Sequence, residues 1–580
     1  MFYLLSPQAY KFVRQSGNLI LPHPSTIHKI SSKLNVNPQK EADDMLFLAY
    51  AKQKACYLKE HELYVSLMMD EIHIRPFLDY KSGDIVGIGQ EVDNLASSAH
   101  VFMIQSILCS FKDVVHILPS KKMTAEVLFT VLKKVIVGLE GIGFKVIVVV
   151  SDNNSINRRC ISLFNNPLSN FVFPHPVDAT RPLFYAVDPV HIIKSVRNNW
   201  LNQKNPEQAM YFPNFDLSSN NVCTSSFLTL KNMYEAESGN LLKYGYTISR
   251  KALWPTNLER QSVKLALQIF NQQVSQGLKE LGVKHNLLKF HETSAYIKIF
   301  SSWFSIMNVK TPNKGVHSCD EFCKPLVWNE SDRKFVFLNN FLDWLIKWKD
   351  MKSDTGRLTK ETLSALILTT TCMIELCRYC IGELNMSYFL PGKIQTDELE
   401  HRFSLYRRMA GTHYHISLRQ VFEVENKLRA CSVLNLTMLS KSKGIIVIDD
   451  FSNSFDLIDT SREITVKYIH NFKHIDVTDA DLESMVDKLP LVAYLAGYCC
   501  HSVMNRLKCD DCGGNLVIEK PLIIPPNFKH IHNCDGGGLK YLSADVINVI
   551  LHNFIVVQKL ISPEYEKSFL QVSNQRNLIS

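Results

Sequence analysis

The stretch Phe144-Lys-Val-Ile-Val-Val-Val-Ser-Asp152 decides which fold class we expect for this chain. Every residue from Phe144 to Val150 is apolar except Lys145. A run that is apolar at consecutive positions is typical of a central strand covered on both faces. The run ends at Asp152 and the turn-prone Asn153-Asn-Ser, so a carboxylate is expected where the strand ends. We therefore predict an α/β domain with an acidic residue at one edge of its sheet.

The residues before this strand predict the rest of the sheet. A strand-like run from Glu62 to Met69 ends at Asp70, and further strand candidates begin at Ile85 and Val101. Thr124 is placed to cap a helix that precedes the central strand. The apolar face of this helix has the spacing of a helix that covers a sheet. Its members are Leu128, Val131, Leu132, Val135 and Leu139.

Composition limits the class of protein. The chain has 580 residues, too many for one core, so several domains are expected. Lys and Arg exceed Asp and Glu by 64 − 56 = 8, which permits a polyanionic partner without requiring one. The 15 cysteines are scattered, which favours reduced thiols in an intracellular protein. We expect neither a secretory signal nor a membrane span.

The pattern of apolar residues changes along the chain and predicts the domain boundaries. Residues 1–60 look helical, like a small helix-turn-helix segment, and residues 61–200 hold the sheet. Helical patterns dominate residues 201–385, and a further helix is predicted within residues 386–440. The simplest explanation is a helical insertion that splits one α/β domain. Residues 441–580 are predicted to form a C-terminal domain that contains a Cys-x-x-Cys motif.

Three carboxylates have the placement that a metal-dependent nuclease needs. Asp70 and Asp152 follow hydrophobic strands, and Glu400 lies on a predicted helix beyond the insertion. Two acids at strand ends and one on a helix can hold a pair of divalent cations for attack on a phosphodiester. Each acid also has a simpler interpretation. A single Asp at a strand end is usually a turn residue or a helix cap, and Asp397 with Glu400 could be N-terminal acids of their helix.

At this point the motifs resemble those of the P-element transposase family, including its relatives with THAP domains. Six segments support the resemblance, and they occur in the family's order. They are Leu5-Ser-Pro-Gln-Ala-Tyr with Leu21-Pro-His-Pro; Asp70-Glu-Ile-His-Ile; Ser151-Asp-Asn-Asn-Ser; Asp188-Pro-Val-His-Ile-Ile-Lys194; Gln395-Thr-Asp-Glu-Leu-Glu-His-Arg-Phe; and Tyr494-Leu-Ala-Gly-Tyr with Cys509-Asp-Asp-Cys512.

The resemblance implies an RNase H-like catalytic domain whose Asp, Asp, Glu motif binds Mg²⁺ or Mn²⁺. The matching residues are Asp70, Asp152 and Glu400. It also implies that the helical insertion binds GTP as a cofactor that the reaction does not hydrolyse. Four residues are candidates for binding this cofactor: Asp188, Lys194, Asn198 and Asp397. Lys194 could contact its phosphates, and Asp188 or Asp397 could bind its magnesium or orient neighbouring groups.

The residues alone do not predict GTP binding, because no Gly-x-x-x-x-Gly-Lys-Ser/Thr loop is present. For Asp188 the simpler interpretation is the start of a helix, with Pro189 in its first position. The chain also departs from the family at its start. Full-length members begin with a zinc-binding THAP domain that reads DNA, and no cysteine precedes Cys56 here. We therefore expect that module to be missing.

Two other features have competing interpretations. Cys509 and Cys512 form half of a zinc site that nearby histidines or Cys534 could complete, or they belong to a reduced turn. Arg402 follows Glu400 and could face nucleic-acid phosphates together with Arg407 and Arg408, or lie on a solvated helix face.

Together these patterns predict a P-element-like DNA transposase that cleaves DNA and transfers strands with GTP as cofactor. We expect it to act in the nucleus, as a homo-oligomer on transposon ends and target DNA. The alternative is a domesticated, non-catalytic factor that binds nucleic acid or protein.

Overall fold

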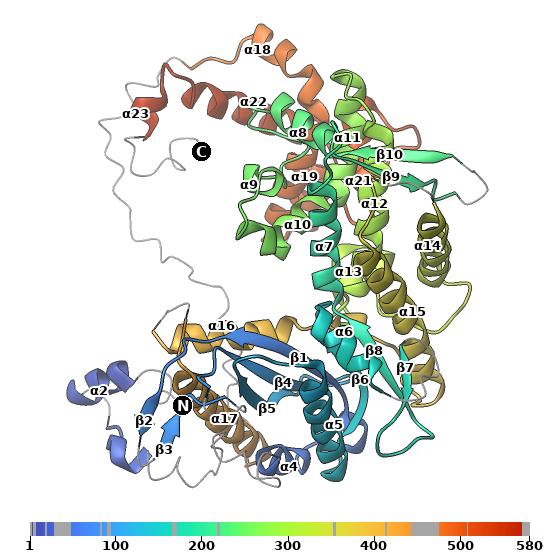
Figure 1. Ribbon diagram of the computed structural model, residues 1–580. Coiled ribbons are helices and arrows are strands. Elements are labelled where there is room, and N and C mark those ends of the chain that lie inside the picture. The colour runs from blue at the N-terminus through green and yellow to red at the C-terminus, as the bar shows by residue number, and fades with distance from the viewer. Residues whose placement is uncertain are drawn as a thin grey trace.

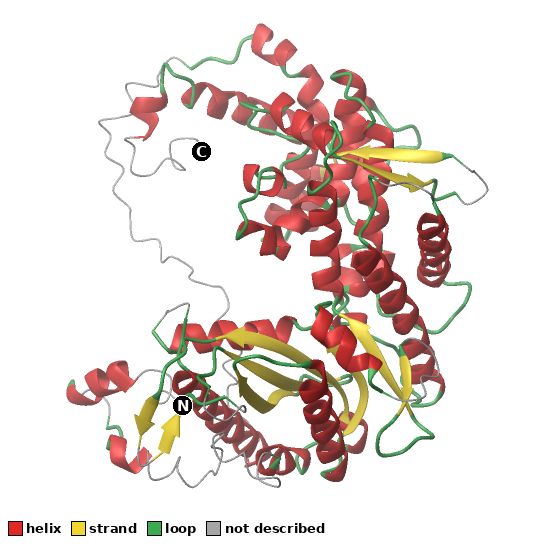
Figure 2. Ribbon diagram, in the orientation of Figure 1, coloured by secondary structure: helices red, strands yellow, loops and turns green. Residues whose placement is uncertain are grey.

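The computed structural model describes residues 3, 7–17, 20–27, 48–81, 84–89, 94–164, 171–216, 221–351, 355–411, 415–441, 475–506 and 509–570. These residues form two lobes (Figure 1). We call residues 48–188 and 394–441 the sheet lobe, and residues 189–393 and 475–570 the helical lobe. The lobes are joined along one side of the molecule and separated by an opening on the other (Figure 1). Most strand residues lie in the sheet lobe (Figure 2).

The sheet lobe is built on one mixed sheet with the strand order β5–β4–β1–β6–β8–β7. The strands are β1 Tyr64–His73, β4 Ser98–Ser106, β5 Lys112–Ser120, β6 Lys145–Ser151, β7 Val172–Pro174 and β8 Pro182–Val187. β1 pairs antiparallel with β4 and parallel with β6, and β6 pairs parallel with β8. Because β1 and β6 are parallel neighbours, the chain between them must cross back over the sheet, and such a crossover usually contains a helix.

That crossover helix is α5, Ala125–Gly141, and it confirms the predicted helix. The Thr124 hydroxyl accepts the Val127 N–H at 3.3 Å and so caps its first turn. The five apolar side chains predicted for its covering face are all buried. The prediction for β6 is also confirmed, since every residue from Val146 to Ser151 is buried.

Other strand predictions need correction. Asp70 lies within β1 and does not end it, because pairing with β4 continues to His73. The segment at Ile85 is part of a separate hairpin formed by β2, Asp79–Lys81, and β3, Asp84–Val86. β5 and β8 were not predicted at all.

The helical lobe contains most of the predicted insertion. Its first part comprises α7 Pro189–Leu201, α8 Phe227–Ala236, α9 Arg250–Leu253, α10 Val263–Ile269, α11 Gln272–Lys284, α12 Phe290–Met307, α13 Lys314–Ser318, α14 Arg333–Asp350 and α15 Lys360–Gly382, with the hairpin β9 Ala209–Pro213 and β10 Val222–Ser226. Four tryptophans form its centre and are almost fully buried. They are Trp200, Trp303, Trp344 and Trp348.

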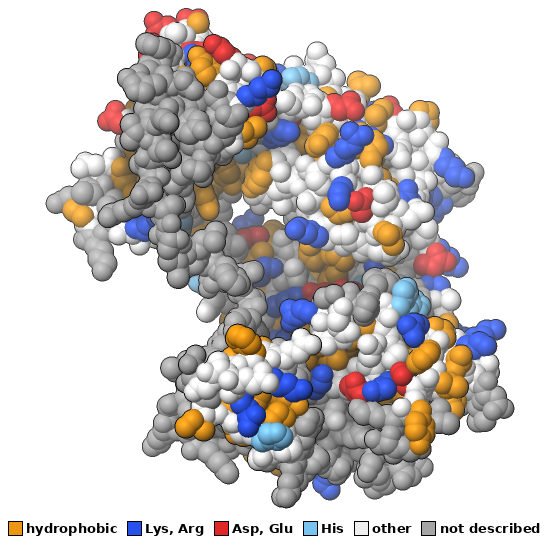
Figure 3. All heavy atoms as spheres, turned by 90° about the vertical axis from the view of Figure 1, so that its left-hand side faces the viewer, with side chains coloured by type: hydrophobic (Ala, Val, Ile, Leu, Met, Phe, Trp, Pro, Cys, Tyr) orange, Lys and Arg blue, Asp and Glu red, His pale blue; other side chains and the backbone are white. Residues whose placement is uncertain are grey.

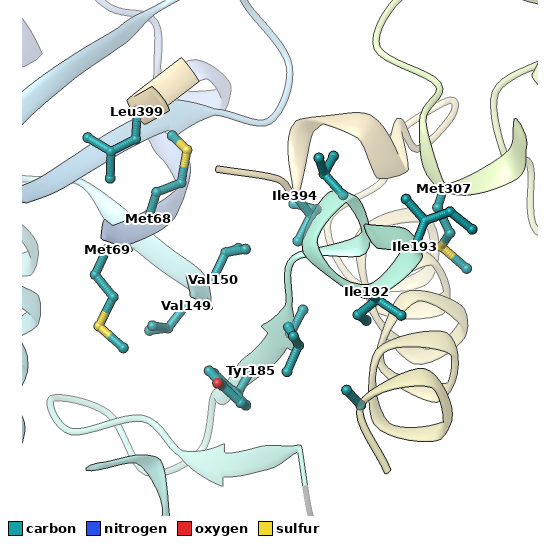
Figure 4. Close-up of a cluster of buried hydrophobic side chains, with 14 of the residues drawn as sticks. Met68, Met69, Val149, Val150, Tyr185, Ile192, Ile193, Met307, Ile394 and Leu399 are labelled. Carbon is teal, nitrogen blue, oxygen red and sulfur yellow. The ribbon is translucent and has the colours of Figure 1, made fainter. Parts of the chain in front are cut away.

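The insertion and the sheet share one continuous hydrophobic core. Figure 4 shows how side chains of β1 and β6, among them Met68 and Val150, lie near Ile192 and Ile193 of α7 and Met307 of α12. α15 extends this connection to β8. The Thr369 hydroxyl accepts the Val187 N–H at 3.0 Å and donates to the Val187 carbonyl at 2.9 Å.

By length and composition α15 is the one helix in the described part of the chain that could cross a membrane. It packs against β8, α14 and α7, and more than half of its apolar window is buried inside the protein. These contacts are those of a core helix of a globular domain.

The remaining helices lie around the sheet lobe and the helical lobe. α4 Ala49–Ala55, α16 Asp397–Met409 and α17 Leu418–Lys441 belong to the sheet lobe, and α2 Pro7–Gln15 precedes it. The C-terminal helices α18 Asp479–Ser484, α19 Leu489–Met504, α20 Asp510–Leu516, α21 Lys529–Cys534, α22 Ala544–Leu560 and α23 Glu566–Leu570, with strands β11 Val517–Ile518 and β12 Tyr541–Leu542, pack around a second, smaller core.

Candidate active site

Two of the three predicted carboxylates, Asp70 and Asp152, lie on or directly after the neighbouring parallel strands β1 and β6. Met68 of β1 pairs with Val150 of the parallel strand β6. Asp70 lies two residues further along β1, and Asp152 directly follows the end of β6, so the two residues are expected to be close together where β6 ends. Glu400 lies in the first turn of α16, which packs on β1, with Leu399 beside Met68 (Figure 4).

The electrostatics of Asp70 indicate that all three carboxylates converge. The pKa of Asp70 is raised to about 7, mainly by burial, and the negative charges of Asp152 and Glu400 make smaller contributions in the same direction. The charge of His191 and the Glu71 N–H, which donates to Asp70 Oδ1 at 2.8 Å, act in the opposite direction. Three carboxylates from β1, the end of β6 and α16 therefore share one electrostatic environment.

Each of the other two carboxylates is held by neighbouring groups. Asp152 Oδ1 accepts the Asn157 side-chain amide at 2.6 Å and the Asn154 N–H at 3.2 Å, which orients it at the start of α6, Ser155–Ser162. Glu400 Oε1 lies 2.9 Å from His191 Nε2. This hydrogen bond lowers the pKa of Glu400, and the charges of His191 and Lys194 add to the effect.

His191 is a member of this site that our sequence reasoning did not select. Burial of the ring disfavours its charged form, but the bond to Glu400 and the charge of Asp188 raise the pKa of His191 overall. Its position three residues after Asp188, at the start of α7, was the available signal. The side chain of Glu400 is 44% exposed, so the site remains accessible to solvent.

The donor atoms at this site suit a hard divalent cation, because carboxylate oxygens are the ligands that Mg²⁺ and Mn²⁺ prefer. Asp152 and Glu400 both raise the pKa of Asp70, so a positive charge here would oppose their repulsion. Among the described residues, no group of three or more His, Cys, Asp or Glu side chains is already arranged at ligand distances. The carboxylate oxygens suit Mg²⁺ or Mn²⁺, but the described side chains are not yet arranged at the distances of a bound ion.

The residues predicted to bind GTP have different surroundings. Asp188 is fully buried and caps α7, where it accepts the Val190 N–H at 2.8 Å and is hydrogen-bonded by the Thr396 hydroxyl. Pro189 occupies the first helical position, so the simpler interpretation of this motif describes the local structure correctly. Asp188 thus ties α7 to the start of α16.

The other three predicted GTP contacts lie along α7 and α16. Asp397 forms an ion pair with Lys310 of the helical lobe. Asn198 donates to the Arg260 carbonyl at 3.2 Å. Lys194 is half-buried on the same helix as His191, and its charge acts on both His191 and Glu400. Of the four, Lys194 has the charge and the location to meet a phosphate.

Arg402 does not face solvent, which contradicts the hypothesis that it binds phosphate. Its guanidinium forms two bonds with Glu425 of α17, at 2.8 and 2.9 Å, and a third with Asp113 of β5 at 3.1 Å. The Tyr406 hydroxyl also donates to Glu425, at 2.5 Å. This buried network fixes α16, the helix that carries Glu400, against α17 and β5.

The zinc prediction for the Cys-x-x-Cys motif stays a prediction. Cys509 is exposed at the start of α20, and the side chain of Cys512 lies outside the described residues. His530 and Cys534 lie on α21, with the sulfur 3.9 Å from the imidazole nitrogens. None of the cysteines whose side chains are described forms a disulfide.

Comparison with known proteins gives three findings. The family model described as TNP-like, RNase H N-terminal domain matches residues 43–165. The transposable element P transposase of Drosophila melanogaster is 24% identical over 466 residues, which is 77% of this chain and 55% of the relative. The solved Drosophila P element transposase strand transfer complex superposes with a TM-score of 0.62 at 19% identity, covering 75% of this chain and 90% of that one.

These findings confirm the predicted fold class, an RNase H-like mixed sheet combined with a mainly helical insertion. The chain spans about half the length of the curated relative that it matches. Residues 43–165 thus match the TNP-like RNase H N-terminal domain, and about three quarters of the chain is similar in sequence and in fold to P element transposase.

Proposed function

We propose that this protein is a DNA transposase of the P-element kind, which cleaves DNA and transfers strands with divalent cations held by Asp70, Asp152 and Glu400. The observation that carries the proposal is the placement of Asp70 on β1, of Asp152 directly after the neighbouring strand β6, and of Glu400 on α16, which packs on β1. A buried carboxylate such as Asp70 close to two other acids costs stability, so this arrangement favours a functional site.

The chemistry divides between the cations and the chain. When bound, two divalent cations would activate the attacking oxygen and stabilise the leaving oxygen of an in-line displacement. The chain itself orients the donors. Asn157 and Asn154 hold Asp152, the capped start of α7 places His191, and His191 keeps a proton on Nε2 directed at Glu400.

The shape of the molecule leaves room for a DNA substrate. Figure 3 shows a deep hollow between the two lobes, with basic and acidic side chains inside it. α16, which carries Glu400, runs along the border of the sheet lobe that faces the opening (Figure 1). We expect duplex DNA to occupy this hollow and a second copy of the chain to complete a synaptic assembly on the DNA in the nucleus.

The experiment that tests this proposal is strand-specific cleavage of DNA that carries the ends of the encoding element, with Mg²⁺ or Mn²⁺. Asp152→Asn and Glu400→Gln should lose cleavage by orders of magnitude while keeping the fold. Glu398→Gln is a matched control, because Glu398 lies on the same helix and pairs with Lys112 away from the other acids. Full cleavage by Glu400→Gln would refute the proposal. Cation-independent DNA binding without cleavage by the wild type would instead support the domesticated binding factor.

GTP is part of the proposal, with Lys194 as its phosphate contact. Support comes from the location of Lys194 on α7, where its charge reaches Glu400. Binding of a fluorescent GTP analogue should weaken in Lys194→Ala and stay unchanged in Lys298→Ala, an exposed lysine of α12. Equal affinities of both variants and the wild type would rule out Lys194 as the contact.

A further inference from the structure

A cavity of about 770 Å³ lies between the insertion and the C-terminal helices, away from the three carboxylates. Its walls come from the loop before α9, from α13, α19 and α21, and from the loop that follows α21. This volume is typical of sites that bind organic ligands. We call it the tyrosine pocket after three of its lining residues, Tyr246, Tyr494 and Tyr498.

One wall of the tyrosine pocket is a fixed aromatic surface. The ring of Tyr494 lies 5.0 Å from the imidazole of His530, which also contacts Tyr244 edge-on at 5.0 Å. Burial lowers the pKa of His530 to about 4, so this ring is neutral at pH 7. The wall is therefore aromatic and uncharged.

Two further rings are exposed to solvent, and the hydroxyl of one of them, Tyr246, is hydrogen-bonded with Tyr494. The side chains of Tyr246 and Tyr498 are 56% and 71% exposed, although large aromatic groups gain most from burial. Both face a cavity and not a flat surface. Such rings offer stacking faces to any planar group that enters.

The charge of the lining is positive. Lys243 and Lys540 lie in the pocket, and within the described part of the chain neither forms an ion pair with a carboxylate, although Lys243 Nζ lies 5.6 Å from the centre of the Tyr234 ring. Asp320 is the one carboxylate among the lining residues, and it already accepts the Phe322 N–H at 3.0 Å and the Cys323 thiol. The pocket thus combines cationic and aromatic groups.

The shape of the pocket is held by a tightly packed glycine loop. A Cβ atom at Gly536 would lie 2.1 Å from the Cys319 carbonyl oxygen, and one at Gly538 would lie 2.5 Å from the Cys319 sulfur. Asp535 Oδ1 accepts backbone N–H groups of Gly537, Gly538 and Leu539 and so fixes the loop that leads to Lys540. The cavity is preformed, which lowers the cost of binding.

We propose that the tyrosine pocket binds an unpaired DNA segment. Tyr246 and Tyr498 stack on its bases, and Lys243 and Lys540 contact its phosphates. Aromatic rings next to cations are the usual means of holding single strands without sequence preference. In a duplex the base faces are already stacked on each other, so these rings select unpaired DNA. The choice of DNA as ligand rests on the proposed function, but this binding requires neither divalent cation nor cleavage.

The test is fluorescence anisotropy of a labelled oligodeoxythymidine and of a duplex of equal length, with the full chain in EDTA. Tyr498→Ala and Tyr246→Ala should each weaken single-strand binding about tenfold or more and leave duplex binding unchanged. Tyr80→Ala is the matched control, because this equally exposed ring lies on β2 of the other lobe. Thermal unfolding checks that all three variants are folded.

A second measurement tests the lysines. Replacing both Lys243 and Lys540 by Gln should reduce the slope of log affinity against log salt by about 1.4, since each single-strand phosphate contact contributes about 0.7. Tyrosine variants that bind the single strand like the wild type would overturn the proposal. Glu400→Gln should lose cleavage and still bind the single strand normally. The two measurements therefore test the cation site and the tyrosine pocket separately.

Discussion

The ion-pair cluster around Glu140 allows a quantitative prediction about the stability of the sheet lobe. Glu140 is 3% exposed at the end of α5 and accepts the Arg181 guanidinium at 2.7 Å and the Val146 N–H at 2.8 Å, with His175 Nε2 at 3.2 Å. Burial alone would raise the pKa of Glu140, but the contacts with His175, Arg181 and Val146 lower it to about 2. The ionised carboxylate therefore stabilises the folded state.

The size of this effect follows from the difference between the folded and unfolded pKa values. A shift from 4.5 to about 2 corresponds to about 3 kcal/mol of stability at pH 7. Because the folded pKa is depressed, the contribution is complete above pH 4.5 and is lost as the pH falls toward 2. At pH 3 less than half of it should remain. Glu140→Gln should thus destabilise the protein by about 3 kcal/mol at pH 7 and by roughly half of that or less at pH 3.

Urea unfolding followed by far-UV circular dichroism measures this difference, with amide hydrogen exchange of β6 and β8 to locate it. Tryptophan fluorescence is not suitable, because all six tryptophans lie between residues 200 and 348. Glu126→Gln on the same helix is the control, since the side chain of Glu126 is 64% exposed. A loss at pH 3 as large as that at pH 7, or an equal loss in Glu126→Gln, would refute the reasoning.

Three further predictions concern the elements around the candidate active site. Arg402→Ala should lower the free energy of unfolding by about 3–5 kcal/mol in urea melts, because it leaves the buried Glu425 without its main partner; an effect below 1 kcal/mol would show that the network is not needed. His191→Ala should raise the pKa of Glu400, whose largest lowering influence is lost, as measured by carboxyl ¹³C NMR; an unchanged pKa would contradict the hydrogen bond. Thr369→Val should cost about 1–3 kcal/mol and increase hydrogen exchange at the end of β8, where a buried N–H and carbonyl lose their partner; unaltered exchange would argue against this connection.

The elements predicted correctly from the sequence are those whose signal is local. β6 is buried on both faces, so its apolar run is continuous, and the polar residues after it mark Asp152 as its end. α5 combines a capping threonine with a regular apolar face. Both signals lie within about 30 residues and depend on no distant partner.

The elements that the sequence did not predict depend on distant contacts. β8 is a short run, Pro182-Leu-Phe-Tyr-Ala-Val, and it becomes a strand by pairing with β6 and bonding to α15. β1 extends past Asp70 because β4 pairs with its whole length. In each case tertiary pairing decides the boundary, and local propensity does not.

The candidate active site shows the same division. Asp152 was identifiable from its strand, whereas Glu400 was only a weak candidate from its predicted helix until the family resemblance supported it. The hydrogen bond between His191 and Glu400 joins residues 209 positions apart, and no local pattern reveals such a contact. Arg402 was misassigned for a related reason, because its partners Asp113 and Glu425 lie on other elements.

The central claim is that Asp70, Asp152 and Glu400 form one cation site. The most direct measurement is Mn²⁺ binding to the full chain, followed by electron paramagnetic resonance at neutral pH, for the wild type and for Asp70→Asn, Asp152→Asn, Glu400→Gln and the control Glu398→Gln. The account predicts that each of the first three substitutions weakens Mn²⁺ binding strongly and that the control binds like the wild type. Wild-type affinity in any of the three would contradict a shared site.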